Sequence, residues 1–102
     1  MFRIIKVTGE SLSPMIQEGD YVVVVTLPFF LKRIKTGDII VFDQAVYGKM
    51  IKMVASVAND GGEITVVGSH ANSVDSRRFG AIPGRAVVGK VIWHIAKPGA
   101  TR

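Results

Sequence analysis

Residues 46–67 read VYGKMIKMVASVANDGGEITVV, and this stretch largely decides the fold class. Two runs rich in Val, Ile and Met flank residues 59–62, whose sequence NDGG is typical of a tight turn, so the stretch predicts a β-hairpin. Other runs of the same kind are bounded by turn residues, at 2–7, 21–26, 39–42 and 86–95. Several short strands at close spacing predict an all-β chain, folded as a compact antiparallel β-barrel or sandwich.

Helical signals are scarce. Residues 13–17 read SPMIQ, in which Ser13 suits an N-cap and Pro14 suits the first helical position. We therefore expect one short helical turn in an otherwise all-β chain.

The composition bounds the class of protein. The chain has 102 residues, of which 48% are hydrophobic and 21% charged, so we expect a single domain over residues 1–102. It contains no cysteine, which excludes disulfide scaffolds, thiolate zinc sites and cysteine nucleophiles. Its longest apolar stretch is interrupted by Thr26 and Pro28, and is shorter than the ~20 residues of a membrane span. We expect no transmembrane segment or signal peptide, and a location in the cytoplasm or at a membrane periphery.

The net charge of +5 is compatible with nucleic acid, anionic lipid or an acidic peptide as a partner, and does not choose among them. Residues 29–35 read FFLKRIK, so an apolar start at Phe29 and Phe30 is followed by basic residues up to Lys35. This segment is either a solvated loop beside the core or a contact with a lipid surface or partner.

A serine near the N-terminus is a candidate nucleophile. Residues 9–15 read GESLSPM, so Ser11 follows the flexible Gly9 and precedes the expected helical turn. Such a corner can expose a hydroxyl beside free backbone N–H groups, which is what an oxyanion site needs. An ordinary structural turn is the alternative interpretation.

A serine nucleophile needs a base, and the two histidines are poor candidates for that role. His94 follows Trp93 in a predicted strand, where a packed or surface role is expected, and His70 lies in a polar loop. Two histidines without a third ligand do not make a metal site, so we expect neither a metal nor a cofactor.

Lys52 is the better candidate base. In a strand it shares a face with Met50 and Val54, which would remove water from its amine. Desolvation lowers the pKa of a lysine, and a base that works at a pKa of roughly 7–8 requires about 3–5 kcal/mol of such destabilisation. Lys49 is the competing residue but lies nearer the turn at Gly48. An edge-strand amine that reaches water is the alternative.

A third segment, residues 72–80, reads NSVDSRRFG. Asp75 and Arg77 are opposite charges close enough to brace a loop, and Ser73 and Ser76 offer hydroxyl groups. Without the other two segments, this one would be interpreted as an ordinary polar loop.

Taken in order, with the turn Gly19-Asp20 between the first and the second, these three segments resemble the signal peptidase I family. The most specific part is the run S-x-D-S-R-x-F-G from Ser73 to Gly80 with Pro83 after it, and the resemblance covers about residues 7–92. It implies an all-β catalytic core with a Ser/Lys dyad that hydrolyses a peptide bond. The sequence departs from the family pattern at Met53, where Arg is common, and at residues 68–70.

Carried over residue by residue, the resemblance makes Ser11 the nucleophile and Lys52 the general base. Gly9 and the Ser11 N–H would line the oxyanion site, and Ser73 would orient the lysine amine. The residues implied to shape the site structurally are Asp75, Ser76 and Arg77.

The lack of an anchor helix and of a large inserted β-domain suggests a small soluble branch of the family, similar to nickel-type superoxide dismutase maturation proteases. The leading hypothesis is a serine endopeptidase that removes an N-terminal leader from a protein precursor, with no nucleic acid as partner. One alternative is a signal peptidase acting at the membrane surface through residues 29–35. A second, from a different class, is a non-catalytic basic β-module that binds nucleic acid or peptide.

Overall fold

The computed structural model describes residues 2–7, 16, 18–26, 34–68 and 74–96, and within them the chain is almost entirely strand. The strands are β1 (Phe2–Lys6), β2 (Tyr21–Val25), β3 (Ile39–Gln44), β4 (Gly48–Ala58), β5 (Glu63–Val67), β6 (Ile82–Pro83) and β7 (Val87–Ile95). The helical elements are the short helix α1 (Ser76–Phe79) and two 3-10 turns, η2 (Asn59–Gly61) and η3 (Gly84–Ala86).

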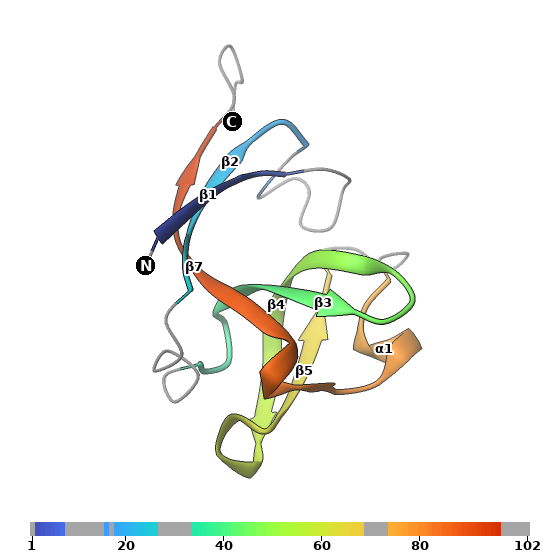
Figure 1. Cartoon of the computed structure of the whole chain (residues 1–102). Helices are drawn as coiled ribbons and strands as arrows, with labels where there is room; N and C mark the ends of the chain where they lie inside the picture. The colour runs from blue at the N-terminus through green and yellow to red at the C-terminus, as the bar shows by residue number, and fades with distance from the viewer. Residues whose placement is uncertain (1, 8–15, 17, 27–33, 69–73, 97–102) are drawn as a thin grey trace.

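The seven strands form one antiparallel sheet in the order β1-β2-β7-β3-β4-β5-β6. The predicted all-β antiparallel fold is therefore confirmed. The sheet is not a closed barrel, because β1 and β6 are its two edges among the described strands. Figure 1 shows β7 running from the β1–β2 hairpin at one end to β3, β4 and β5 at the other.

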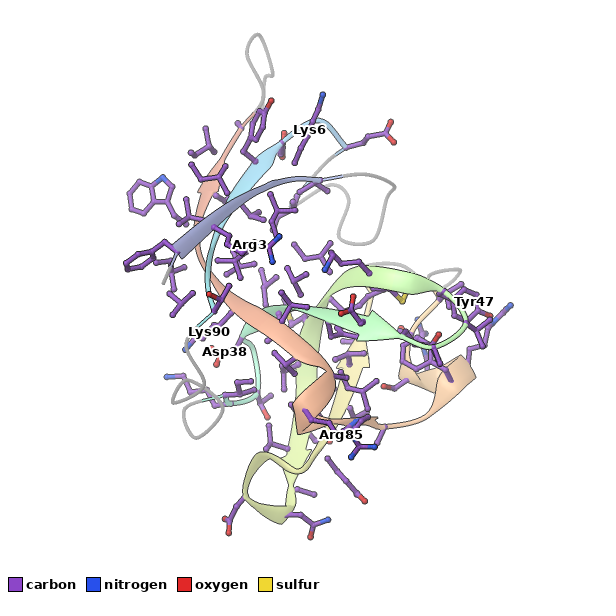
Figure 2. All side chains as sticks on the ribbon, in the orientation of Figure 1. Arg3, Lys6, Asp38, Tyr47, Arg85 and Lys90 are labelled. Atoms are coloured by element: carbon purple, nitrogen blue, oxygen red, sulfur yellow. The ribbon has the colours of Figure 1, made fainter. Side chains whose placement is uncertain are left out.

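The hairpin predicted over residues 46–67 is present as β4 and β5, but β4 starts later than expected. In the turn between β3 and β4, the side-chain oxygen Oε1 of Gln44 accepts the N–H groups of Val46 and Tyr47, at 2.6 and 2.7 Å. This side-chain cap holds both residues in the turn, although their type favours strand. The Tyr47 ring, labelled in Figure 2, lies 6.2 Å from the Phe79 ring of α1.

The helical turn expected at residues 13–17 lies outside the described residues, apart from the buried Ile16. The described helix is α1, which the sequence analysis did not predict.

Two apolar clusters stabilise the sheet, and β3 contributes to both. Its alternate side chains Ile40 and Phe42 belong to the first cluster, whereas Ile39 and Val41 belong to the second. A strand with both faces covered reads as a continuous apolar run, which explains the sequence IIVF. The other buried members of the first cluster are Ile34, Val54, Ile64, Val66 and Ile82, and those of the second are Val7, Ile16, Val22, Val24 and Ile51.

The long strand β7 joins the two parts of the sheet by close approach to its neighbours. A Cβ at Gly89 would lie 2.1 Å from the Val24 side chain and 2.6 Å from the Val25 carbonyl, so only glycine fits there. Next to it, Lys90 Nζ lies 3.2 Å from Asp38 Oδ2, just before β3 (Figure 2). These contacts hold β7 between β2 and β3.

Candidate functional site

Lys52 lies in the middle of β4, opposite Ile40 of β3, and is only 2% exposed. Its same-face neighbours Met50 and Val54 both pack in the first apolar cluster, as the sequence pattern predicts. The competing Lys49 has a side chain 47% exposed, with its Nζ 3.4 Å from the exposed carboxylate of Asp43. The structure therefore separates the two lysines, because one amine is buried and the other is solvated.

The environment of Lys52 shifts the amine toward its neutral form. Burial lowers its pKa, and this effect outweighs the nearby Asp75 carboxylate, which raises the pKa, while the Arg77 guanidinium lowers it further. An uncharged amine can accept a proton, so Lys52 has the chemical property of a general base.

Asp75 is a fully buried carboxylate with three sets of partners. Its oxygens accept the backbone N–H of Gly68 at 2.8 Å and that of Arg77 at 2.9 Å, and the guanidinium Nη2 of Arg77 lies 2.8 Å away. The side-chain hydrogen bonds from Arg77 are the main reason why the pKa of Asp75 falls to about 2, and the two backbone donors add to the effect. The expected ion pair between residues 75 and 77 is present, and Asp75 stays ionised at neutral pH.

Residues 75 and 76 also complete the outer edge of β5. Its residues Glu63 and Ile64 pair with β6, which ends after two residues. Farther along β5, the hydroxyl Oγ of Ser76 accepts the Val66 N–H at 2.9 Å, and Asp75 accepts the next outward N–H, that of Gly68. The side chains thus replace a missing strand, and they also position the Asp75–Arg77 pair near Lys52.

The segment containing Gly9 and Ser11 and the residue Ser73 lie outside the described residues, as does His70. The residues that flank the first segment on both sides are described. The Val7 N–H donates to the Asp20 carbonyl at 2.7 Å, and the Gly19 N–H donates to the Val7 carbonyl at 2.9 Å. Within the segment, the buried Ile16 packs in the same cluster as Ile51, the residue before Lys52.

One buried acid beside these flanking residues was not expected from the sequence. Asp20 directly precedes β2 and is fully buried, and its Oδ2 lies 2.6 Å from Nε2 of His94 on β7. The one local signal was its place two residues before Val22, on the buried face of β2. The partly exposed His94 packs as expected, but against a carboxylate. The described residues hold no group of three or more His, Asp or Glu side chains able to bind a metal.

Comparisons with known proteins identify the family. A family model described as "Signal peptidase, peptidase S26" matches residues 1–62, more than half of the chain. The match covers the Ser11 segment and Lys52 and ends before residues 72–80. A search of curated proteins finds no significant match. In the described part of the chain, no helix has the length and apolar character of a membrane span.

Proposed function

This chain belongs to the signal peptidase family, peptidase S26, and from that premise we propose that it is a serine endopeptidase with Ser11 as nucleophile and Lys52 as general base. It would remove an N-terminal leader from a protein precursor. The observation that carries the proposal is the burial of Lys52 in β4, together with the lowered pKa of its amine. The finer placement in a branch that matures superoxide dismutase stays a prediction.

The chemistry follows from a neutral amine. Lys52 accepts the proton of the Ser11 hydroxyl as its oxygen attacks the scissile carbonyl, and the resulting ammonium donates that proton to the leaving amine. The Ser11 N–H would stabilise the oxyanion. Water then attacks the acyl-enzyme as Lys52 takes its proton, and the ammonium returns that proton to the Ser11 oxygen as the acyl product leaves.

The Asp75–Arg77 pair supports this role of Lys52 through its charges. Asp75 alone would be a buried anion near the amine and would favour the ammonium form. Arg77 holds that carboxylate in a paired state and adds a positive charge that lowers the pKa of Lys52. Asp75 can therefore brace the edge of β5 at little cost to the basicity that catalysis needs.

Chain connectivity limits how far Ser11 can lie from β4. Ser11 precedes Ile16 by five residues, so a fully extended chain limits their separation to about 17 Å. Ile16 and Val7, which border the segment, both pack in the cluster that contains Ile51. Both ends of the segment are therefore anchored in the cluster that covers the face of β4 opposite to the Lys52 side chain.

The test is cleavage of a model precursor whose leader ends in small side chains, with the product mass measured by mass spectrometry. Ser11→Ala and Lys52→Ala should abolish cleavage while circular dichroism stays that of the wild type. Lys49→Ala is the matched control from the same strand and should cleave normally. Cleavage by both Ser11→Ala and Lys52→Ala would contradict the dyad. A serine-acylating probe that fails to label Ser11 would favour the non-catalytic basic β-module.

A second candidate, processing at a membrane surface, is favoured by an exposed apolar face. Phe2, Ile4 and Trp93 are 67%, 68% and 66% exposed, and β1, β2 and β7 bring them to one side of the sheet. Lys6, which is labelled in Figure 2, lies on the same side and pairs with Tyr21. Aromatic side chains beside lysine, on a chain of net charge +5, suit an anionic bilayer surface.

Co-sedimentation with vesicles of phosphatidylglycerol and phosphatidylcholine tests this second candidate. Ile4→Ser with Trp93→Ser should abolish binding, whereas Val46→Ser, at the exposed tip of the β3–β4 hairpin, should not. Loss of binding only on substitution of Phe29 and Phe30 would instead assign the contact to residues 29–35. If the wild type does not bind vesicles, the second candidate is wrong and the first, leader removal away from membranes, is favoured.

A further inference from the structure

We propose that Asp20 and His94 form a positioning pair that fixes the base of the segment carrying Ser11. The catalytic part of this inference rests on the proposed function, whereas the structural part does not. Asp20 belongs to the part of the sequence that resembles the family, whereas His94 does not, and the contact joins residues 74 positions apart in the chain.

The pair is set by the register of β2 and β7. Val22 lies directly opposite His94, and Asp20 is two residues before Val22, so the carboxylate and the imidazole are diagonal neighbours on one face. That face is the buried one, since Val22 and Val24 are inaccessible to solvent. A buried carboxylate is costly without partners, and His94 Nε2 lies within hydrogen-bond distance of it, at 2.6 Å.

The backbone of Asp20 connects the same point to β1. Its carbonyl accepts the Val7 N–H, and the preceding Gly19 donates its N–H to the Val7 carbonyl. Through Asp20, the end of β1, the start of β2 and the end of β7 are therefore joined. The side chain fixes this junction to β7, and the backbone fixes it to β1.

By this proposal, the junction fixes the two points between which the segment that contains Ser11 is attached. Ile16 packs in the second cluster together with Val7 and Val22, so the first described residue after Ser11 is anchored beside the junction. A nucleophile misplaced by about 1 Å can cost about a hundredfold in rate. The pair therefore acts through Ser11, as a positioning element, and does not touch the reacting atoms.

The test compares His94→Phe, which keeps a planar ring without a donor, with His94→Gln, which keeps a donor. Ile95→Ala changes the neighbouring residue on the opposite, exposed face of β7 and serves as the matched control. Hydrogen exchange of the Val7 and Gly19 amides is measured by NMR in the intact chain. We expect exchange about tenfold faster in His94→Phe and within about threefold of wild type in His94→Gln.

Cleavage of the model precursor provides the second readout. In His94→Phe, kcat should fall about tenfold while KM changes less than about twofold, and His94→Gln should recover most of the loss. Amide exchange in His94→Phe equal to that in Ile95→Ala would overturn the proposal. Faster exchange with unchanged kcat would also overturn it, because the junction would then be fixed without positioning Ser11. If the wild type cleaves no precursor, the proposed function fails and the exchange measurement alone decides whether the pair fixes the junction.

Discussion

Replacement of Lys52 by Met should stabilise the protein in a pH-dependent manner. Methionine has nearly the volume and the apolar stem of lysine but no amine, so packing against Met50 and Val54 is largely kept. In the wild type the amine is buried, and its pKa lies below the ordinary value of 10.5. The folded state therefore bears the cost of an ammonium group that the unfolded state solvates.

The sign follows from proton linkage. Between the lowered pKa of the folded state and 10.5, the unfolded chain binds more protons, so the stability of the wild type rises with pH in that window. The wild type therefore has its full stability above pH 10.5. It loses stability as the pH falls from 10.5 to the pKa of the folded state, and below that pKa no further loss occurs. Each unit of lowering corresponds to about 1.4 kcal/mol. Since Lys52 is almost fully buried, solvent screening reduces this figure little.

The assay is urea unfolding of wild type and Lys52→Met at intervals from neutral pH to pH 10.5, with Lys49→Met as the matched control. The stability advantage of Lys52→Met should be greatest near neutral pH and should shrink as the pH rises. The solvated amine of Lys49 should give a difference below about 0.5 kcal/mol at every pH. An advantage of Lys52→Met that is independent of pH would refute the reasoning, because the amine would then titrate normally in the folded state.

Three further predictions concern the surroundings of this amine and the sheet. Arg77→Met should raise the pKa of Lys52, because Asp75 loses its compensating charge; the acidic limb of kcat/KM should move to higher pH, and an unmoved limb would contradict this. The pKa of Asp75, about 2 against 3.8, gives stability that is present above pH 4 and lost as the pH falls through about 2. Asp75→Asn should thus cost about 2 kcal/mol at pH 6 in urea unfolding, and the difference should disappear near pH 2. A difference in stability that persists at pH 2 would contradict this prediction. Gly89→Ala should lower the Tm by several degrees in calorimetry, since its Cβ would overlap the Val24 side chain, and an unchanged Tm would show that β7 can shift.

Local patterns were sufficient to predict the six longer described strands and the burial of Lys52. The alternation that places a lysine between Met50 and Val54 on one face involves adjacent residues, and the tertiary structure did not override it. The same holds for the β4–β5 hairpin, whose turn residues Asn59 and Asp60 both adopt φ of +54°, a region these residue types tolerate.

Features set by distant contacts could not be predicted. The two-residue strand β6 exists because it pairs with Glu63 and Ile64, and nothing within its own sequence marks it as a strand. The contact between Asp20 and His94 depends on the β2–β7 register, which is shifted between Val23 and Val24. No sequence pattern specifies that register shift. The insertion of β7 between β2 and β3 is equally non-local.

The position of β7 has a consequence for biosynthesis. Because β7 is the last of the described strands to leave the ribosome, β2 and β3 keep bare edges until residues 87–95 emerge. Pairings this distant along the chain fold slowly, and until they form nothing holds the N-terminal hairpin beside β4. A nascent chain would therefore remain inactive until β7 docks, and a fragment ending at residue 62 should be neither folded nor proteolytic.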